Sequence, residues 1–277
     1  MMEYRISLTG DLGSGKSTVS RIISNLHGCE IYSTGKICRE KAAEMGIPDI
    51  KDMNIFMGTH PEIDKWIDDG LKMLSSHKGN LIVDSRMAWH FTANTFRVYL
   101  ACEALVAAER IFGDNRASEA YSTPQETMRS NLERKQSENA RYKTLYGVDI
   151  YDLTNYDLIV DTTSAKPEEV AAAVLDGCEA KAGGDRYFSG MLCPERLFPT
   201  SDTLDDGTPA VCSYKNNFYI LSGHKAVMEA IRQKKSFVGC DIVPVGDSTL
   251  LDTYDGGDFP KWAAELDALN VRKYERV

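Results

Sequence analysis

The segment Gly10-Asp11-Leu12-Gly13-Ser14-Gly15-Lys16-Ser17-Thr18 decides the fold of the first part of this chain. It fits the pattern G-x-x-x-x-G-K-[ST], in which a glycine-rich loop joins a strand to a helix and holds phosphate groups. Upstream, apolar and polar residues alternate from Tyr4 to Leu8, which predicts a strand. Downstream, apolar residues recur at helical spacing from Val19 to Leu26. The loop therefore stands in the context that the pattern requires, and the alternative is a chance glycine-rich turn.

The loop predicts a site for a polyphosphate and a magnesium ion. Its glycines let backbone N–H groups close around a phosphate, and the start of a helix adds positive potential. Lys16 would reach the outer phosphates, and the Ser17 hydroxyl would ligate Mg²⁺. The predicted cofactor-binding residues are Gly10, Gly13, Ser14, Gly15, Lys16, Ser17 and Thr18.

Composition limits what this loop can belong to. With 277 residues, 43% of them hydrophobic, the chain can bury one large core or two smaller ones. A net charge of -9 and a pI near 5.2 argue against a general nucleic-acid binder, which needs a basic face. No apolar run approaches the roughly 18 residues that span a bilayer, and the first residues are polar too early for a signal peptide. We expect a cytoplasmic protein without a membrane or nucleic-acid partner; the sequence specifies no oligomeric state.

The seven cysteines predict buried, reduced thiols rather than a metal site. They lie at positions 29, 38, 102, 178, 193, 212 and 240, where they form neither a C-x-x-C pair nor an even framework.

Strand-like runs alternate with helical patterns as far as about residue 180, which predicts an α/β fold with a parallel sheet between helices. The clearest later strands are 81–84, 96–100 and 158–161, and Pro167 begins the helix that follows the last of them. The composition then changes at 182–185, which resembles a linker. We therefore predict two domains, 1–181 and 185–277. In the second, 202–206 is expected to be a solvated turn and the residues from 252 onward a helical extension.

Two clusters beyond the loop are candidates for binding an acceptor substrate. In 32–39 a strand ends and a helix begins, so Thr34, Gly35 and Arg39 would hold a second phosphate, unless Ser33 or Thr34 simply caps the helix. In 83–89, at the carboxyl end of a strand, Asp84 would hold magnesium through water and Arg86 would grip a phosphate. The alternative for Asp84 and Arg86 is a buried salt bridge between the two.

A third cluster lies on a long polar helix predicted from Pro124 to Tyr146. Arg134, Glu138 and Arg141 fall at offsets of four and three and so share one face, where they would close over a nucleotide as a lid. A solvated helix with internal ion pairs gives the same pattern.

Together these clusters resemble the cytidylate kinase family, and its archaeal-type members in particular. The resemblance covers roughly residues 3 to 180 and is carried by GDLGSGKST, YSTGKICRE, VDSRMAW and RKQSENARYKTLYGVDIYDLTNYDLIVDT, in that order. The lid motif is its most specific part, with family residues at Arg134, Ser137, Glu138, Arg141, Tyr142, Tyr146, Gly147 and Asp149.

The resemblance implies a P-loop kinase that transfers a phosphoryl group from ATP to a nucleoside monophosphate, with CMP or dCMP as first candidates. Lys16 and Ser17 would handle ATP and Mg²⁺, and Arg39 and Arg86 would hold the acceptor phosphate. Arg134 and Arg141 would close on the transferring group, and no catalytic histidine is required. The implied catalytic residues are Lys16, Arg86, Arg134 and Arg141.

Two departures and two alternatives accompany this prediction. Lys135 stands where the family usually has an acid, and Ser85 replaces a glycine beneath the acceptor, which bears on base selectivity. A kinase for another small metabolite and a nucleotide-sensing regulator both remain open.

The second predicted domain resembles the ParB/sulfiredoxin-like fold over about residues 185 to 250. The resemblance rests on 193–200, 210–212 and 217–230, which read as an opening turn, a strand and a strand–turn–helix. It implies a phosphate site at Gly223, His224 and Lys225, where the start of a helix would face a nucleotide. Gly223 replaces the reactive cysteine of sulfiredoxins, so sulfinic acid reduction is not expected. The alternative is a turn that only packs the sheet, with His224 capping the helix.

Overall fold

Strands and helices alternate through the first 183 residues of the computed structural model, which describes residues 2–47, 50–114, 122–201, 203–246 and 251. The elements of this first part are β1 (Arg5–Gly10), α1 (Lys16–His27), β2 (Glu30–Ser33), α2 (Thr34–Glu44), α3 (Ile50–Thr59), α4 (Pro61–Met73), η1 (Leu74–Ser76), β3 (Leu81–Asp84), α5 (Ala88–Phe91), β4 (Phe96–Ala101), α6 (Ala104–Gly113), α7 (Pro124–Tyr146), η2 (Leu153–Asn155), β5 (Leu158–Asp161) and α8 (Pro167–Gly183). The predicted α/β fold is confirmed.

Shorter elements follow α8. They are β6 (Gly190–Leu192), η3 (Pro194–Arg196), β7 (Leu197–Phe198), β8 (Ala210–Tyr214), β9 (Asn217–Ser222), α9 (His224–Arg232) and β10 (Val238–Ile242). The predicted C-terminal extension from residue 252 lies outside the described residues.

One sheet runs through both parts of the chain. Its strand order is β2-β3-β1-β4-β5-β6-β10-β8-β9-β7, and the first five strands are parallel. Strands β1, β3, β4 and β5 are short and almost fully buried, as expected of a parallel sheet covered on both faces, whereas β2 at the edge of the sheet is exposed or half-buried. One face packs on α1 and α8 around Ile6, Val98 and Val160, and the other supports α4 and α7 around Leu81 and Val83.

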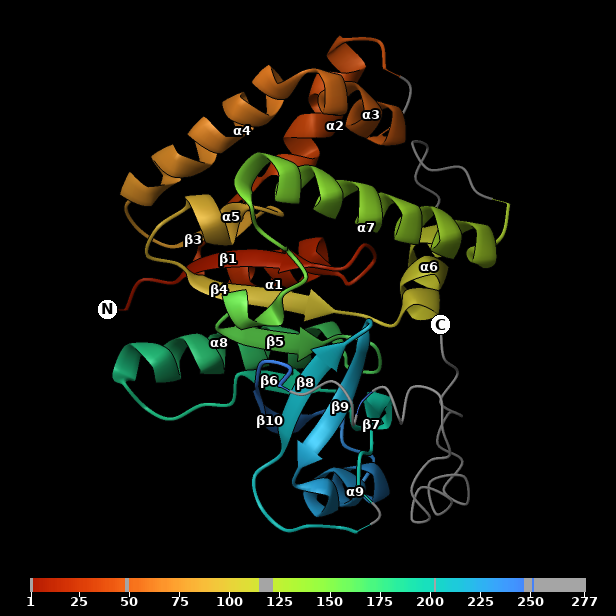
Figure 1. Cartoon of the computed structure of the whole chain (residues 1–277). Coiled ribbons are helices and arrows are strands. Elements are labelled where there is room, and N and C mark those ends of the chain that lie inside the picture. The colour runs from red at the N-terminus through yellow and green to blue at the C-terminus, as the bar shows by residue number, and fades with distance from the viewer. Residues whose placement is uncertain (1, 48–49, 115–121, 202, 247–250, 252–277) are drawn as a thin grey trace.

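The arrangement of the sheet fixes the place of the site. Strand β1 lies between β3 and β4, and ligands of open α/β sheets bind at the carboxyl ends of the strands. The loop after β1, the residues after β3 and the start of α2 all lie at this edge. Helix α7 crosses beside it, and α2, α3 and α4 gather at the end of the molecule opposite to β8, β9 and α9 (Figure 1).

The later strands continue the sheet of the first part instead of forming a separate one. Strand β6 pairs in parallel with β5, matching Ile159 with Gly190, and β10 then pairs with β6. A single core joins Tyr99 and Ile159 with Val211 and Val227. The predicted linker is the end of α8, whose C-cap is Gly184. A division into two domains remains a prediction, but the shared core couples the two parts.

The cysteine prediction and the membrane prediction can be compared with the structure. All seven cysteines lie in the described part and are free thiols, and all but Cys38 are buried. Of the helices that the structure describes, none has the length and apolar character to cross a bilayer.

Candidate active site

The loop after β1 holds Lys16 by its own backbone. Lys16 Nζ donates hydrogen bonds to the carbonyl oxygens of Gly10 at 3.0 Å and Asp11 at 2.7 Å, and Ser14 Oγ donates to Asp11 O at 2.8 Å. Burial and the nearby Arg86 charge lower the pKa of Lys16 to about 7. A phosphate placed here would restore the charged form of this ammonium group, because an opposite charge favours it.

The predicted site residues of the first part surround one cavity of about 500 Å³. Its wall includes 12–19 from the loop and α1, Thr34, Gly35 and Arg39 from α2, and Asp84 and Arg86 after β3. Arg134, Glu138 and Arg141 of α7 complete it, so the three distant clusters do meet. Gly10 is not part of the wall and acts through its carbonyl oxygen. Arg129, another basic residue of α7, is exposed and is not part of the wall.

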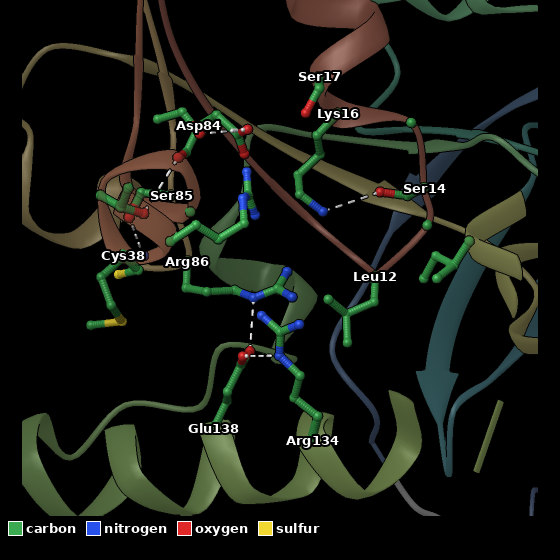
Figure 2. A pocket seen from close by; sticks show the side chains of 18 of the residues that line it. Leu12, Ser14, Lys16, Ser17, Cys38, Asp84, Ser85, Arg86, Arg134 and Glu138 are labelled. Carbon is green, nitrogen blue, oxygen red and sulfur yellow. Dashed lines mark hydrogen bonds and ion pairs between the residues drawn. The ribbon is translucent and has the colours of Figure 1, made fainter. Parts of the chain in front are cut away.

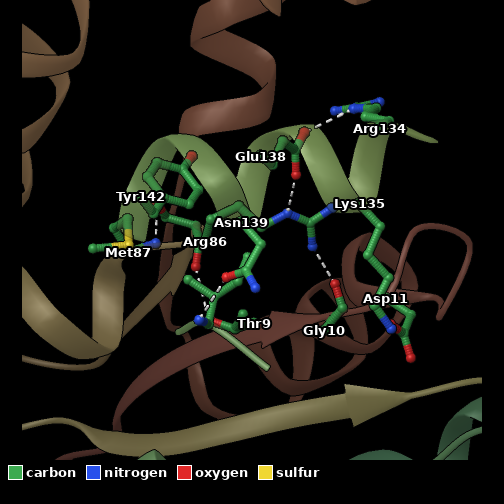
Figure 3. Close-up of polar contacts among 12 residues, drawn as sticks. Thr9, Gly10, Asp11, Arg86, Met87, Arg134, Lys135, Glu138, Asn139 and Tyr142 are labelled. Atoms are coloured by element: carbon green, nitrogen blue, oxygen red, sulfur yellow. Dashed lines mark hydrogen bonds and ion pairs between the residues drawn. The ribbon is translucent and has the colours of Figure 1, made fainter. Parts of the chain in front are cut away.

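Glu138 joins two of the predicted catalytic arginines. Arg86 Nε donates to one carboxylate oxygen at 3.0 Å and Arg134 Nε to the other at 2.8 Å, while Arg86 Nη1 donates to the Gly10 carbonyl. Figure 2 shows both guanidinium groups directed at Glu138 in the cavity, and Figure 3 shows Arg86 between Glu138 and Gly10. Burial raises the pKa of Glu138, but Arg134 and Arg86 outweigh it and lower this pKa to about 2. The carboxylate is therefore ionised and holds both cations at the cavity.

Asp84 and Arg86 do not form the salt bridge that was the alternative to a binding role. Asp84 Oδ2 instead accepts a hydrogen bond from Ser33 Oγ at 3.3 Å, and Arg86 pairs with Glu138. Ser33 Oγ also accepts from the backbone N–H of Lys36, so Ser33 caps α2, which was the alternative for residues 32–39. Ser85 is buried, and its hydroxyl accepts from the Met87 N–H at 3.4 Å.

Lys135 connects the lid helix to the loop. Its Nζ lies 3.0 Å from the Asp11 carboxylate and 4.2 Å from the centre of the Tyr151 ring. Asp11 also accepts from Tyr99 Oη at 2.8 Å and from the Cys102 N–H at 3.0 Å. The lysine that departs from the family pattern thus fastens α7 to the loop (Figure 3).

Comparisons with known proteins agree with this geometry. A family described as an AAA domain matches residues 6–129. A cytidylate kinase of Thermoplasma volcanium is 40% identical over 192 residues, which cover 68% of this chain and 98% of that protein. The chain belongs to the cytidylate kinase family. A cytidylate kinase of Thermoplasma acidophilum is 35% identical over 68% of this chain and 99% of its own length.

Another relative carries the kinase-like part within a larger protein. An S-adenosylmethionine-dependent nucleotide dehydratase of Lacinutrix mariniflava is 33% identical over 63% of this chain, but over only 36% of its own length. The two Thermoplasma cytidylate kinases, in contrast, are matched almost end to end by 68% of this chain. The rest of the chain has no counterpart in those two proteins.

The start of α9, the predicted second phosphate site, is filled by a carboxylate. Asp205 accepts from the Gly223 N–H at 2.6 Å and from the His224 N–H at 3.2 Å, and it also pairs with His224 Nδ1. Its carbonyl oxygen accepts from the Lys225 N–H, while Lys225 Nζ pairs with Asp206. The expected solvated turn at 202–206 is thus, at Asp205, a cap. The phosphate site remains a prediction, and a phosphate would have to displace this carboxylate.

Packing contacts explain the presence of Gly223 and His224 at the start of α9. A Cβ on Gly223 would lie 2.6 Å from the Pro209 nitrogen. His224 is 1% exposed, and its Nε2 accepts from the Thr200 N–H. Both contacts fit the alternative in which the turn packs the sheet.

Sequence reasoning missed three polar residues that the structure singles out. Asn54 and Asp64 contribute to the cavity wall, and Asp205 caps α9. Asp64 could have been recognised from the sequence, because it shares one face of α4 with Asp68 and the apolar Leu71. All three residues are buried. An acid at a buried position of an amphipathic helix is unusual and points to a function.

Proposed function

We propose that this chain transfers the γ-phosphoryl group of ATP to CMP or dCMP. The observation that supports this proposal best is the single cavity on which the glycine loop, Arg39 and Arg86 meet the arginines of α7, in a chain of the cytidylate kinase family. A donor and an acceptor that share one cavity can react directly. A sensor of ATP alone would need only the loop.

The proposed chemistry depends on cations placed where charge collects. Phosphoryl transfer passes through a loose transition state whose negative charge spreads over the equatorial oxygens, so alignment and positive groups supply most of the catalysis. Lys16 would bind the outer phosphates of ATP, and Arg39 would bind the acceptor phosphate. Arg86 and Arg134 would exchange part of their contact with Glu138 for phosphate oxygens. The acceptor is already anionic, so no protein base is required.

The oxygen donors on the cavity fit a magnesium ion. The Ser17 hydroxyl and the Asp84 carboxylate belong to the same wall, and Mg²⁺ is usually held by one or two protein oxygens together with substrate phosphates and water. When bound, the ion neutralises charge on the transferring phosphates. Ser17 and Asp84 would hold and orient it.

The lid helix would exclude water from the reaction. Arg134 and Arg141 lie on α7, which is already fastened to the loop through Lys135 and Asp11. Closure over a bound acceptor would keep ATP from reacting with water, because the site becomes dry only when both substrates fill it.

A coupled assay of ADP release tests the proposal. Purified full-length chain with Mg·ATP is offered CMP, dCMP, UMP, AMP and GMP, together with shikimate and gluconate as small alcohols. We expect CMP and dCMP to accelerate ADP release far above the rate with ATP alone. The proposal is wrong if no nucleoside monophosphate does so, and acceleration by an alcohol alone would identify a kinase of another metabolite.

A further inference from the structure

Three side chains on the cavity wall, Asn54, Asp64 and Arg141, each have a buried polar atom without a partner among the described residues, which for Arg141 is Nε. Asp64 is 5% exposed, and within the described residues its Oδ2 atom has no hydrogen-bond partner. The same is true of the Asn54 Nδ2 atom. An unpaired buried polar group destabilises the fold, so native proteins rarely keep one without a reason. Both residues line the cavity, where a ligand can satisfy these atoms.

The wall around these atoms suits a flat aromatic ligand. The apolar residues Met57, Ile67, Leu71 and Met87 line the same cavity, and so does Tyr142 of α7. Met57 and Ile67 belong to the small core that joins α2, α3 and α4. Ligand sites that orient a ring commonly combine such apolar walls with a few polar groups in fixed places.

We propose that Asp64 and Asn54 select a pyrimidine with an amino group at C4 over one with a carbonyl oxygen there. The Asp64 Oδ2 atom accepts a hydrogen bond from the exocyclic amino group, and the Asn54 Nδ2 atom donates to a ring nitrogen or to the neighbouring carbonyl oxygen. This inference rests on the proposed function, because it concerns the acceptor of that reaction.

The preference for cytosine over uracil follows from the hydrogen-bonding chemistry of the Asp64 carboxylate and the Asn54 amide. An ionised carboxylate only accepts hydrogen bonds, and an amide nitrogen only donates them. Cytosine presents an amino donor at C4, whereas uracil presents an oxygen that would face the Asp64 carboxylate. A site built for such a hydrogen bond rejects the analogue strongly, since the wrong base leaves buried groups unpaired.

Arg141 keeps the carboxylate available for this role. Its Nη2 atom lies 3.6 Å from Asp64 Oδ1, whereas Asp64 Oδ2 has no partner among the described residues. Burial raises the pKa of Asp64, and the Arg141 charge opposes that shift. A donor at Oδ2 would favour the ionised form further.

Steady-state kinetics of Asp64→Asn with CMP, UMP and AMP test this inference. Asparagine keeps the size of the side chain, but it can turn either its oxygen or its NH₂ group toward the base. We expect kcat/KM for CMP to fall at least tenfold and the ratio of CMP to UMP to collapse by at least as much. Asp69→Asn is the matched control: it lies on the same helix, is half-exposed, and pairs with Lys65 and Lys72. Its ratio should equal that of the wild type.

A second variant separates base selection from a purely structural role. Asn54→Leu removes the donor but keeps the branched shape of the side chain, and we expect KM for CMP to rise about tenfold with little change in kcat. AMP is included because adenine shows the same amino group beside a ring nitrogen, so only the walls can reject it. Wild-type turnover of CMP with unchanged ratios in both variants overturns this inference alone. A wild-type chain without activity on any monophosphate overturns the proposed function as well.

Discussion

The chain contains two helix starts of similar design, and they differ in what occupies them. Helices α1 and α9 both begin after a glycine in the left-handed region, Gly15 at φ 82° and Gly223 at φ 76°. A lysine stands in the first turn of each, Lys16 and Lys225. The start of α1 opens on the cavity, whereas Asp205 fills the start of α9.

This difference shows that a helix N-terminus becomes an anion site only if the fold leaves it open. Free N–H groups and the helix dipole attract any anion, including a carboxylate from the chain itself. At α9 the carboxylate of Asp205, which belongs to the chain itself, accepts hydrogen bonds from the N–H groups of Gly223 and His224. At α1 the acid of the loop itself, Asp11, is held by Tyr99, Cys102 and Lys135.

The largest expected effect comes from removing the lysine of α1. Lys16→Ala should lower kcat/KM about a thousandfold, or about 4 kcal/mol of transition-state stabilisation, because Lys16 would meet the charge of the outer phosphates. The matched control is Lys225→Ala at the start of α9, which should keep wild-type kinetics. Coupled assays measure kcat/KM of both variants, and far-UV circular dichroism checks that both are folded. Equal losses of kcat/KM in the two variants would contradict the view that only the start of α1 binds a phosphate of the substrate.

The next largest effect is on the free energy of unfolding, where substitutions of Gly15 and Gly223 should differ. A Cβ at Gly223 would lie 2.6 Å from Pro209 N, whereas at Gly15 it would meet nothing within 4 Å. Gly223→Ala should therefore lose about 3 kcal/mol, from the left-handed backbone and from overpacking together. Gly15→Ala pays only the backbone term, about 1 kcal/mol. Urea unfolding of both variants measures the difference, and similar losses would mean that Pro209 moves aside easily.

Local patterns in the sequence were enough for the first part of the fold. The loop pattern, the strands at 81–84 and 158–161 and the helix from Pro124 to Tyr146 all appear at their predicted bounds, because each is set by nearby residues. The convergence of α2, β3 and α7 on one cavity was also predictable, since parallel strands end at a common edge.

What the sequence did not reveal depends on contacts between distant residues. Nothing near Asp205 says that it would cap α9, 18 residues later, and nothing near Gly190 says that β6 would join β5. Glu138 was recognised as part of a lid, but its position between Arg86 and Arg134 requires that α7 lie over β3. Such pairings come from the sheet order, which local periodicity does not specify.

The smallest expected effect concerns Asp205, and its dependence on pH has a definite sign. Burial acts to raise the pKa of Asp205, but hydrogen bonds from the Gly223 N–H and from His224 outweigh it and lower this pKa. A lowered carboxyl pKa stabilises the fold above the ordinary value near 4, and the contribution is lost as the pH falls through the folded-state pKa. Asp205→Ala should therefore cost about 1 kcal/mol at pH 7, as loss of a helix cap does, and progressively less as the pH falls below the ordinary carboxyl pKa near 4.

The same substitution decides whether α9 can hold an anion at all. In a Lys16→Ala background, which weakens the loop site, inorganic phosphate should leave the melting temperature of the chain unchanged while Asp205 is present. Adding Asp205→Ala frees the Gly223 and His224 N–H groups, and phosphate should then raise the melting temperature. A rise with Asp205 intact that disappears in Lys225→Ala would instead establish the predicted second phosphate site. It would also mean that ligand binding displaces the Asp205 cap, and α9 would then be an anion site that the chain itself keeps closed until a ligand competes for it.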